Sequence, residues 1–300
     1  MKKGLKRPLE LAIEIASSKP STISLSEGHE PRVVAAAVEA VNLGIAKIIL
    51  VGKVEEIKHQ LAKYPCSYPD RIKIHDPIRS SLIKEFSKTY YELRKHKGIT
   101  YEDAEKQAKS NLVYAALLVK NGHADGTLSG AVETTSNVVK TAIWVLGKAM
   151  QVKTVSSCFL IFPKSHEPMI YADCGLVIEP NDEELVDITI AASQSCKSLL
   201  NTDPRIALLS FSTKGSAKHG NTDKILSALK KLKSLEPELL VDGELQFDAA
   251  IDSAVGKIKA PKSKVAGTAN VMIFPNLDAG NIAYKITQRL GNADAYGPIL

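Results

Sequence analysis

Short apolar runs alternate with amphipathic stretches along the whole chain. Near the start, residues 22–26 (TISLS) and 46–52 (AKIILVG) are apolar enough to predict two strands. Between them, Pro31 marks the start of a helix and Gly44 its end. A strand, a helix and a strand in this order predict two parallel strands joined by a right-handed crossover.

The same alternation continues to the end of the chain. Thr100 and Asp103 form a capping-box pattern that predicts a helix running to Gly122, and Asn181 with Glu184 predicts one ending near Leu200. Further helices are predicted from residue 222 and over 279–290. The remaining apolar runs predict strands within residues 124–131, 155–162, 169–175, 205–212, 238–245 and 270–276.

This order of elements predicts an α/β protein with two three-layer domains and a cleft between them. A chain of 300 residues exceeds the size at which one hydrophobic core is usual. We expect the first domain to cover residues 1–150 and the second 151–290, with the boundary in the bridging stretch 144–153. Residues 291–300 are expected to return toward the first domain.

Composition narrows the class of protein. The chain is 44% hydrophobic and 24% charged, which are ordinary values for a globular protein. No run approaches the ~20 apolar residues of a membrane span, and Glu10 and Glu14 interrupt the basic N-terminal stretch, so it predicts a first helix rather than a signal peptide. We therefore expect a cytoplasmic protein that does not bind membranes.

The net charge of +6 favours a polyanionic small molecule over nucleic acid, because aromatic residues make up only 5% of the chain. A solvated basic surface is the alternative explanation. Four cysteines without CxxC spacing predict free thiols, and seven histidines without HxH or HExxH spacing predict no metal site.

Polar loops follow several of the predicted strands. They are residues 26–32, 129–137, 210–220 and 274–281. In open parallel sheets, ligands bind beyond the carboxyl ends of the strands, where such loops gather. The four loops together therefore predict one ligand site, which we place in the interdomain cleft.

One of these loops suits phosphate. Its hydroxyls, glycine and lysines precede a predicted helix whose N-terminal end is positive; they are Ser212, Thr213, Lys214, Gly215, Ser216 and Lys218. Arg94, in a basic run, predicts a bidentate phosphate contact. A solvated turn and an ordinary basic surface are the alternatives. Asp242 and Glu244 could form an acid/base couple or a simple cap.

Longer motifs carry a family resemblance. They are YYELRKHKGIT, ADGTLSGA, ALLSFSTKGSAK, VDGELQFDAAI, KVAGTANVMIFPNLDAGNIAYKITQRL and AYGPIL. With these motifs the chain resembles the phosphotransacetylases, or phosphate acetyltransferases, over nearly its whole length. The resemblance implies the reversible conversion of acetyl-CoA and phosphate to coenzyme A and acetyl phosphate. It also implies a homodimer, a fold similar to isocitrate and isopropylmalate dehydrogenases, and coenzyme A as substrate with no redox cofactor.

The resemblance further implies residues that bind substrate. These are Arg32, Arg94, Ser129, Thr135, Lys140, Ser212, Thr213, Lys214, Gly215, Ser216, Asn281 and Arg289. Catalytic residues are not assigned. An acetyl-cysteine intermediate at Cys158 or Cys174 is a competing mechanism.

Some residues depart from the family pattern. Lys140 stands where the family has arginine, Glu133 where it has histidine, and Asn137 where it has aspartate. The family also continues past the GPI motif with a DLSRG-containing tail that carries the proposed base. We therefore expect ligand binding but impaired turnover. The alternatives are a non-catalytic relic or partner subunit that binds coenzyme A or acetyl phosphate, and a decarboxylating dehydrogenase, which would need a metal-binding carboxylate cluster.

Overall fold

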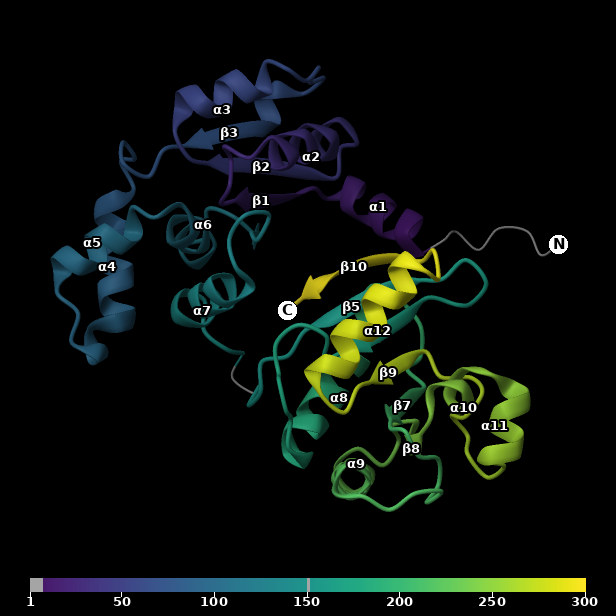
Figure 1. Cartoon of the computed structure of the whole chain (residues 1–300). Coiled ribbons are helices and arrows are strands. Elements are labelled where there is room, and N and C mark those ends of the chain that lie inside the picture. The colour runs from purple at the N-terminus through teal and green to yellow at the C-terminus, as the bar shows by residue number, and fades with distance from the viewer. Residues whose placement is uncertain (1–7, 150–151) are drawn as a thin grey trace. The chain divides into compact units, whose positions relative to one another are not determined.

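The computed structural model describes residues 8–149 and 152–300 (Figure 1). The chain divides into two compact units, residues 1–148 and 149–300. Each unit has its own β-sheet with helices packed on it, so the predicted α/β class is confirmed. None of the helices within the described residues is both long and apolar enough to cross a membrane.

The first unit is built on a four-stranded parallel sheet of order β3-β2-β1-β4. Its strands are β1 (Ser21–Leu25), β2 (Ala46–Val51), β3 (Ile72–His75) and β4 (Gly126–Leu128). Its helices are α1 (Pro8–Ser18), α2 (Pro31–Asn42), α3 (Val54–Leu61), α4 (Ile83–Arg94), α5 (Tyr101–Ala108), α6 (Asn111–Lys120) and α7 (Thr135–Val145), with short 3-10 turns at Pro69–Arg71 and Lys95–Lys97.

Strand β2 shows why this sheet needs helices on both faces. Successive side chains of a strand point to opposite faces. Ile48 and Leu50 pack in a core with α2 and α3, whereas Ile49 and Val51 pack in a second core with α4, α5 and α6. All four side chains are buried, and burial on both faces explains the continuous apolar run that predicted this strand.

The helix predicted to run from Thr100 to Gly122 is wrong in one respect. Its capping box at Thr100 and Asp103 is confirmed, but the structure has two helices, α5 and α6. Ser110 separates them because its backbone is extended, with φ −72° and ψ 134°. Such a conformation ends one helix and begins the next.

The second unit is built on a six-stranded mixed sheet of order β10-β5-β6-β9-β7-β8. Its strands are β5 (Cys158–Phe162), β6 (Met169–Ala172), β7 (Ile206–Leu209), β8 (Val241–Leu245), β9 (Val271–Ile273) and β10 (Asp294–Ile299). Its helices are α8 (Asp182–Leu200), α9 (Gly220–Leu235), α10 (Phe247–Ile251), α11 (Ser253–Lys259) and α12 (Leu277–Arg289). The capping box predicted at Asn181 and Glu184 is confirmed at the start of α8.

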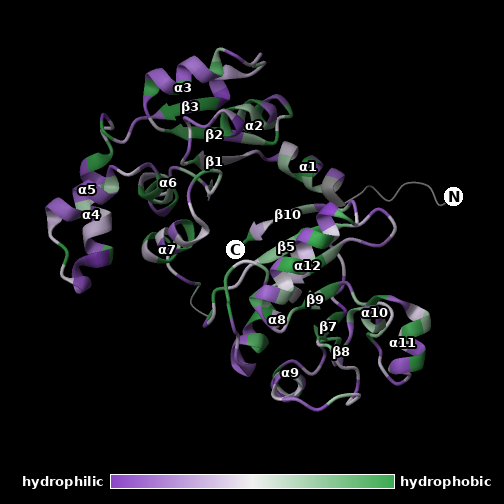
Figure 2. Ribbon diagram, in the orientation of Figure 1, coloured by the Kyte–Doolittle hydropathy of each residue, from purple (hydrophilic) through white to green (hydrophobic). Residues whose placement is uncertain are grey.

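Helices also cover both faces of this second sheet. In β7, Ile206 and Leu208 pack with α8 and α9, whereas Ala207 and Leu209 pack with α10 and α12. In Figure 2 strands such as β2, β7 and β9 are largely hydrophobic, while helices such as α3 carry both hydrophilic and hydrophobic residues. This is the pattern expected when each helix buries one side against a sheet.

We expected residues 291–300 to return toward the first domain. In the structure, Asp294–Ile299 form β10, which pairs antiparallel with β5 at the edge of the second sheet (Figure 1). Ala295 lies opposite Ile161, and Tyr296 lies opposite Leu160. The ladder of backbone hydrogen bonds places this segment in the unit of residues 149–300.

Candidate active site

A buried carboxylate holds the loop that follows β4. Glu27 lies two residues after the end of β1 and is only 4% exposed. Its two oxygens accept four backbone N–H bonds of 2.7 to 3.0 Å, which come from Gly130, Ala131, Val132 and Glu133. The loop that carries the predicted substrate residue Ser129 is therefore positioned by a side chain from the segment that follows β1.

The surroundings of Glu27 keep it ionised. Burial by itself raises the pKa of the Glu27 carboxyl, because a charge loses solvation inside a protein. The four N–H donors outweigh burial and hold the pKa below its ordinary value. Glu27 is therefore an anion at neutral pH, and the backbone N–H groups of the loop stabilise its charge.

Two predicted substrate residues lie together beside this loop. Arg32, in the first turn of α2, pairs through Nε with Glu30 at 2.6 Å, and its Nη2 donates to the carbonyl of Ala131 at 3.0 Å. Ser129 accepts a hydrogen bond of 2.8 Å from the Ser26 hydroxyl. Arg32 and Ser129 both line one cavity of about 320 Å³ at the carboxyl ends of β1 and β4. This is the position that a parallel sheet offers to a ligand.

Two further predicted residues meet at one aromatic ring. The guanidinium carbon of Arg94, at the end of α4, lies over the Trp144 ring, 4.1 Å from its centroid. The ammonium of Lys140 lies over the same ring at 4.4 Å. Lys140 and Trp144 are four residues apart on α7, so they share one face of that helix. The structure thus brings Arg94 and Lys140 together.

Two of the residues expected to depart from the family pattern, Glu133 and Asn137, contact each other. Asn137 donates from its side-chain amide to the carboxylate of Glu133 at 3.1 Å. The backbone N–H of Asn137 also donates to the hydroxyl of Thr134, which caps α7. Thr135 is the first residue of α7 and is exposed. The contact with Asn137 gives one oxygen of the Glu133 carboxylate a hydrogen-bond donor.

In the second unit, the loop predicted to hold phosphate surrounds a carboxylate of the protein itself. Glu244, in β8, is 1% exposed. It accepts hydrogen bonds from the Ser212 hydroxyl at 2.8 Å and from the N–H of Gly215 at 2.7 Å. Ser216 bonds to Ser212 and accepts from the N–H of Thr213. Several donors that predicted a phosphate site are thus used to hold Glu244.

Lys214 is likewise paired within the protein. Its ammonium donates to the Asp242 carboxylate at 2.5 Å and to the carbonyl of Gly243 at 2.8 Å. Burial raises the pKa of Asp242, but hydrogen bonds from Lys214, Ser263 and the Gly243 N–H lower it more, so the pKa lies below its ordinary value. A carboxylate held ionised in this way is a weak general base. The geometry therefore does not favour Asp242 and Glu244 as an acid/base couple.

A third buried carboxylate holds the loop after β6. Asp173 is 3% exposed and accepts from the Ser157 hydroxyl at 2.6 Å. It also accepts the backbone N–H groups of Gly175, Leu176 and Val177. Three buried carboxylates thus have the same role, because each accepts backbone N–H bonds from a loop that follows a strand. They are Glu27, Glu244 and Asp173. Sequence reasoning missed this role.

Helix α12 carries the last two predicted substrate residues. A Cβ on Gly280 would lie 2.2 Å from the carbonyl oxygen of Asp173, so only glycine allows the helix to pack this closely. The side-chain amide of Asn281 donates to the carbonyl of Cys174 at 3.1 Å. Arg289 lies in the last turn and is exposed. Asn281 and Arg289 share a helix but lie two turns apart.

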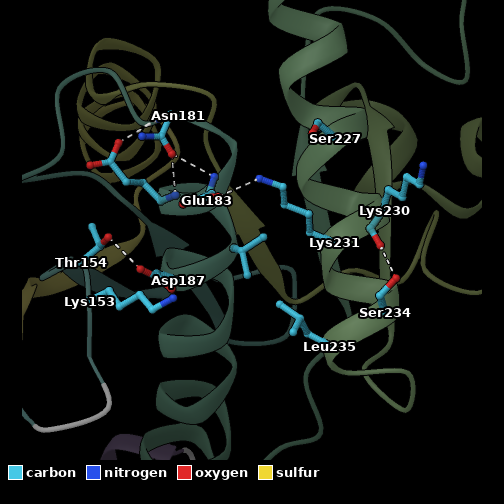
Figure 3. A pocket seen from close by; sticks show the side chains of 12 residues that line it. Lys153, Thr154, Asn181, Glu183, Asp187, Ser227, Lys230, Lys231, Ser234 and Leu235 are labelled. Atoms are coloured by element: carbon cyan, nitrogen blue, oxygen red, sulfur yellow. Dashed lines mark hydrogen bonds and ion pairs between the residues drawn. The ribbon is translucent and has the colours of Figure 1, made fainter.

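The second unit also has a larger groove, of about 680 Å³, between α8 and α9 (Figure 3). Lys231 reaches across it to pair with Asp182 at 3.0 Å and Glu183 at 3.3 Å. The Thr154 hydroxyl donates to Asp187 at 2.8 Å. None of the predicted substrate residues lines this groove. Its central cation, Lys231, is already paired with carboxylates, so size alone does not make this groove the candidate site.

Metal-binding groups do not gather in the described part of either unit. Within residues 8–149 and 152–300, no group of three His, Cys, Asp or Glu side chains is placed to hold a metal ion. All four cysteines are free thiols, and Cys158, Cys174 and Cys196 are buried. The carboxylate cluster that a decarboxylating dehydrogenase would need is not found in this part of the chain.

Comparison with known proteins identifies the family. The family described as "Phosphate acetyl/butaryl transferase" matches residues 9–300. The chain belongs to this family. The phosphate acetyltransferase of Acetivibrio thermocellus is 45% identical over 97% of this chain and 88% of its own length, and that of Thermoanaerobacterium thermosaccharolyticum is 42% identical over 97% and 89%. The crystal structure of a phosphotransacetylase from Streptococcus pyogenes superposes with a TM-score of 0.90 at 38% identity, covering 97% of this chain and 88% of that one.

Membership confirms the resemblance that the sequence motifs carried. The residue assignments drawn from that resemblance stay predictions, as does the expected cleft between two domains. Trp144, Glu27 and Asp173 were not predicted. A weak signal for the two acids was available: each directly follows, or nearly follows, a buried apolar run, where a carboxylate can bind loop N–H groups. For Trp144 the sequence signal was its spacing of four residues from Lys140, which places both on one face of a helix.

Proposed function

We propose that this chain catalyses reversible acetyl transfer between coenzyme A and phosphate, with acetyl-CoA, phosphate, coenzyme A and acetyl phosphate as its substrates and products. The observation that carries the proposal is the family match over residues 9–300 at up to 45% identity with phosphate acetyltransferases. The grouping of Arg32 with Ser129, and of Arg94 with Lys140, supports it from the structure. We also propose two α/β domains and a homodimer.

The chemistry needs cations and hydrogen-bond donors more than it needs a nucleophile from the protein. The thiolate of coenzyme A attacks the acetyl carbonyl of acetyl phosphate, a tetrahedral oxyanion forms, and the C–O bond to phosphate breaks. Fixed donors that face the developing charge can supply several kcal/mol to such a step. Arg94 and Lys140 suit the phosphate group, and Arg32 and Ser129 border a cavity that suits part of the second substrate.

The test is an assay in both directions with purified protein. Acetyl phosphate and coenzyme A should give acetyl-CoA, and acetyl-CoA with phosphate should give acetyl phosphate. A folded protein that binds coenzyme A or acetyl phosphate but shows no turnover in either direction would support a non-catalytic binding protein instead. Absence of both binding and turnover would reject the proposal.

Arg94 gives a prediction within this function. Arg94→Ala should weaken the apparent affinity for the phosphate-bearing substrate about tenfold, because a charge-assisted hydrogen bond contributes roughly 1.5 kcal/mol or more. The KM values for acetyl phosphate and coenzyme A measure this. Lys95→Ala is the matched control, since Lys95 is the next residue and pairs only with Glu92 on the surface. Equal KM values for Arg94→Ala and the parent would remove Arg94 from the site.

Cysteine variants test the covalent alternative. Burial raises the pKa of both Cys158 and Cys174, and these thiols are 4% and 0% exposed. A thiol that is neither ionised nor accessible is a poor nucleophile. Cys158→Ala and Cys174→Ala should therefore keep turnover within about threefold of the parent, whereas a covalent mechanism loses its nucleophile. A folded variant whose turnover falls a thousandfold would reinstate the acetyl-cysteine intermediate.

A further inference from the structure

The candidate site contains one tryptophan with two cations on its ring. Arg94 and Lys140 come from different helices, α4 and α7, yet both lie over the indole of Trp144 at 4.1 and 4.4 Å from its centroid. Two like charges in one neighbourhood repel each other. The negative face of an aromatic ring attracts a cation, so a shared indole can hold both in place.

These two cations differ from Arg32 and Lys214 in the predicted set. Arg32 and Lys214 already pair with carboxylates, Glu30 and Asp242. Among residues 8–149 and 152–300, no carboxylate lies within ion-pair distance of Arg94 or Lys140. Their charge is held by a ring and is not neutralised. It remains available to an anionic ligand.

Open space adjoins the ring. Lys140 and Trp144 line a cavity of about 200 Å³ in the first unit, together with Gln107, Ser110 and Asn137. The Glu133 carboxylate also lines it, and one of its oxygens accepts a hydrogen bond from the Asn137 side chain. A phosphate group is small enough for such a space. Hydroxyl and amide donors beside a cation are the groups that phosphate oxygens accept from.

We propose that Trp144 is a positioning residue for substrate, whose indole holds Arg94 and Lys140 together as a cation pair that binds one phosphate group. The proposal rests on the proposed function, because that function supplies ligands that bear phosphate. The phosphate group belongs either to free phosphate and acetyl phosphate or to coenzyme A, and binding measurements separate these two sources.

The stacking itself can be tested without any activity. Trp144 is the single tryptophan of the 300-residue sequence, so intrinsic tryptophan emission reports on this ring alone. Arg94→Ala and Lys140→Ala should each change the emission intensity or wavelength. Arg71→Ala is the matched control, because it removes a cation that lies 4.8 Å from the ring of Tyr68 in the same unit. Emission that is the same in Arg94→Ala as in the parent would overturn the proposal.

Calorimetric titrations with inorganic phosphate and with coenzyme A test the ligand. Trp144→Ala should weaken the binding of one of these two ligands about tenfold. Trp144→Phe keeps an aromatic face that attracts cations less strongly, so it should weaken that binding about twofold. The ligand that responds identifies the source of the phosphate group. If Trp144→Ala does not fold, Trp144→Phe still tests the proposal. Unchanged affinity of that variant for both ligands would overturn it.

A double variant separates positioning from general damage. When Arg94 is already alanine, the further change Trp144→Ala should weaken binding less than twofold, because the ring then has only Lys140 to position. An equal loss with and without Arg94 would overturn the positioning role. If the parent protein binds neither ligand, the proposed function is rejected, and so is the proposal that the cation pair binds phosphate. The emission test then still decides whether Arg94 and Lys140 stack on Trp144.

Discussion

Replacing Glu27 by glutamine is expected to lower the free energy of unfolding by about 3 kcal/mol or more, because each hydrogen bond to a charged group contributes roughly 1.5–3 kcal/mol and four are affected. Turnover should fall about a hundredfold as well, since a displacement near 1 Å in a substrate loop can cost that much. Denaturant unfolding and the acetyl-CoA assay measure the two effects.

Glu56→Gln is the control for the charge change. Glu56 lies in the same unit, but it is exposed and pairs with the exposed Lys53. Exposed pairs of this kind contribute about 0–1 kcal/mol. The control should leave both unfolding and turnover close to those of the parent. A stable, fully active Glu27→Gln protein would mean that residues 130–133 hold their conformation without the carboxylate.

The same carboxylate sets a dependence on acid. The pKa of Glu27 is lower in the folded protein than its ordinary value, so the folded state favours the ionised form. Its contribution to stability is complete above the ordinary glutamate pKa and is lost as the pH falls through the lowered value. The stability difference between the parent and Glu27→Gln should therefore be largest near neutral pH and should shrink in strong acid.

Much of the fold could be predicted from apolar pattern alone. Strands such as β2 and β7 are buried on both faces, so each is a largely continuous apolar run that stands out from the polar loops around it. Capping boxes located α5 and α8 because they rest on local hydrogen bonds. Information that is local in the chain was therefore sufficient for these elements.

Elements without a strong local pattern were missed. The edge strand β10 has the sequence DAYGPI and is mostly exposed, so its partner β5 rather than its composition makes it a strand. The predicted helix to Gly122 failed because a break of two residues between α5 and α6 leaves the helical periodicity almost unchanged. Pairing and backbone breaks depend on contacts that the pattern does not contain.

The candidate site shows the same limit more sharply. A sequence lists donors, but it does not show which acceptor each donor meets. The hydroxyl of Ser212 bonds to a carboxylate 32 residues away, and the N–H of Gly130 bonds to one 103 residues away. Arg94 and Trp144 meet although they belong to different helices. Loops rich in donors were predicted to bind a ligand, and in two of them, residues 129–137 and 210–220, donors bind a carboxylate of the protein, Glu27 or Glu244.

A second large effect is expected from substitution of Glu244. If the loop of residues 212–216 were built to hold phosphate, removal of the nearby negative charge in Glu244→Gln should strengthen phosphate binding. The structure instead predicts that this variant loses stability and does not bind phosphate more tightly. Glu244 is 1% exposed and is the acceptor for both Ser212 and Gly215, so the loop depends on it. Its ammonium-bearing neighbour, Lys214, is already paired with Asp242.

We therefore expect Glu244→Gln to lower the free energy of unfolding by about 3 kcal/mol, because a buried carboxylate loses charge-assisted bonds from two donors at once. Ser212→Ala should cost about 1–3 kcal/mol, since one donor to the buried charge is removed, and phosphate affinity should change little in that variant. Denaturant unfolding and phosphate titration separate the two readouts. Glu238→Gln serves as the control, because Glu238 is exposed in the turn before β8. Tighter phosphate binding in Glu244→Gln with unchanged stability would show that these donors face a substrate, and the loop would return to the list of phosphate sites.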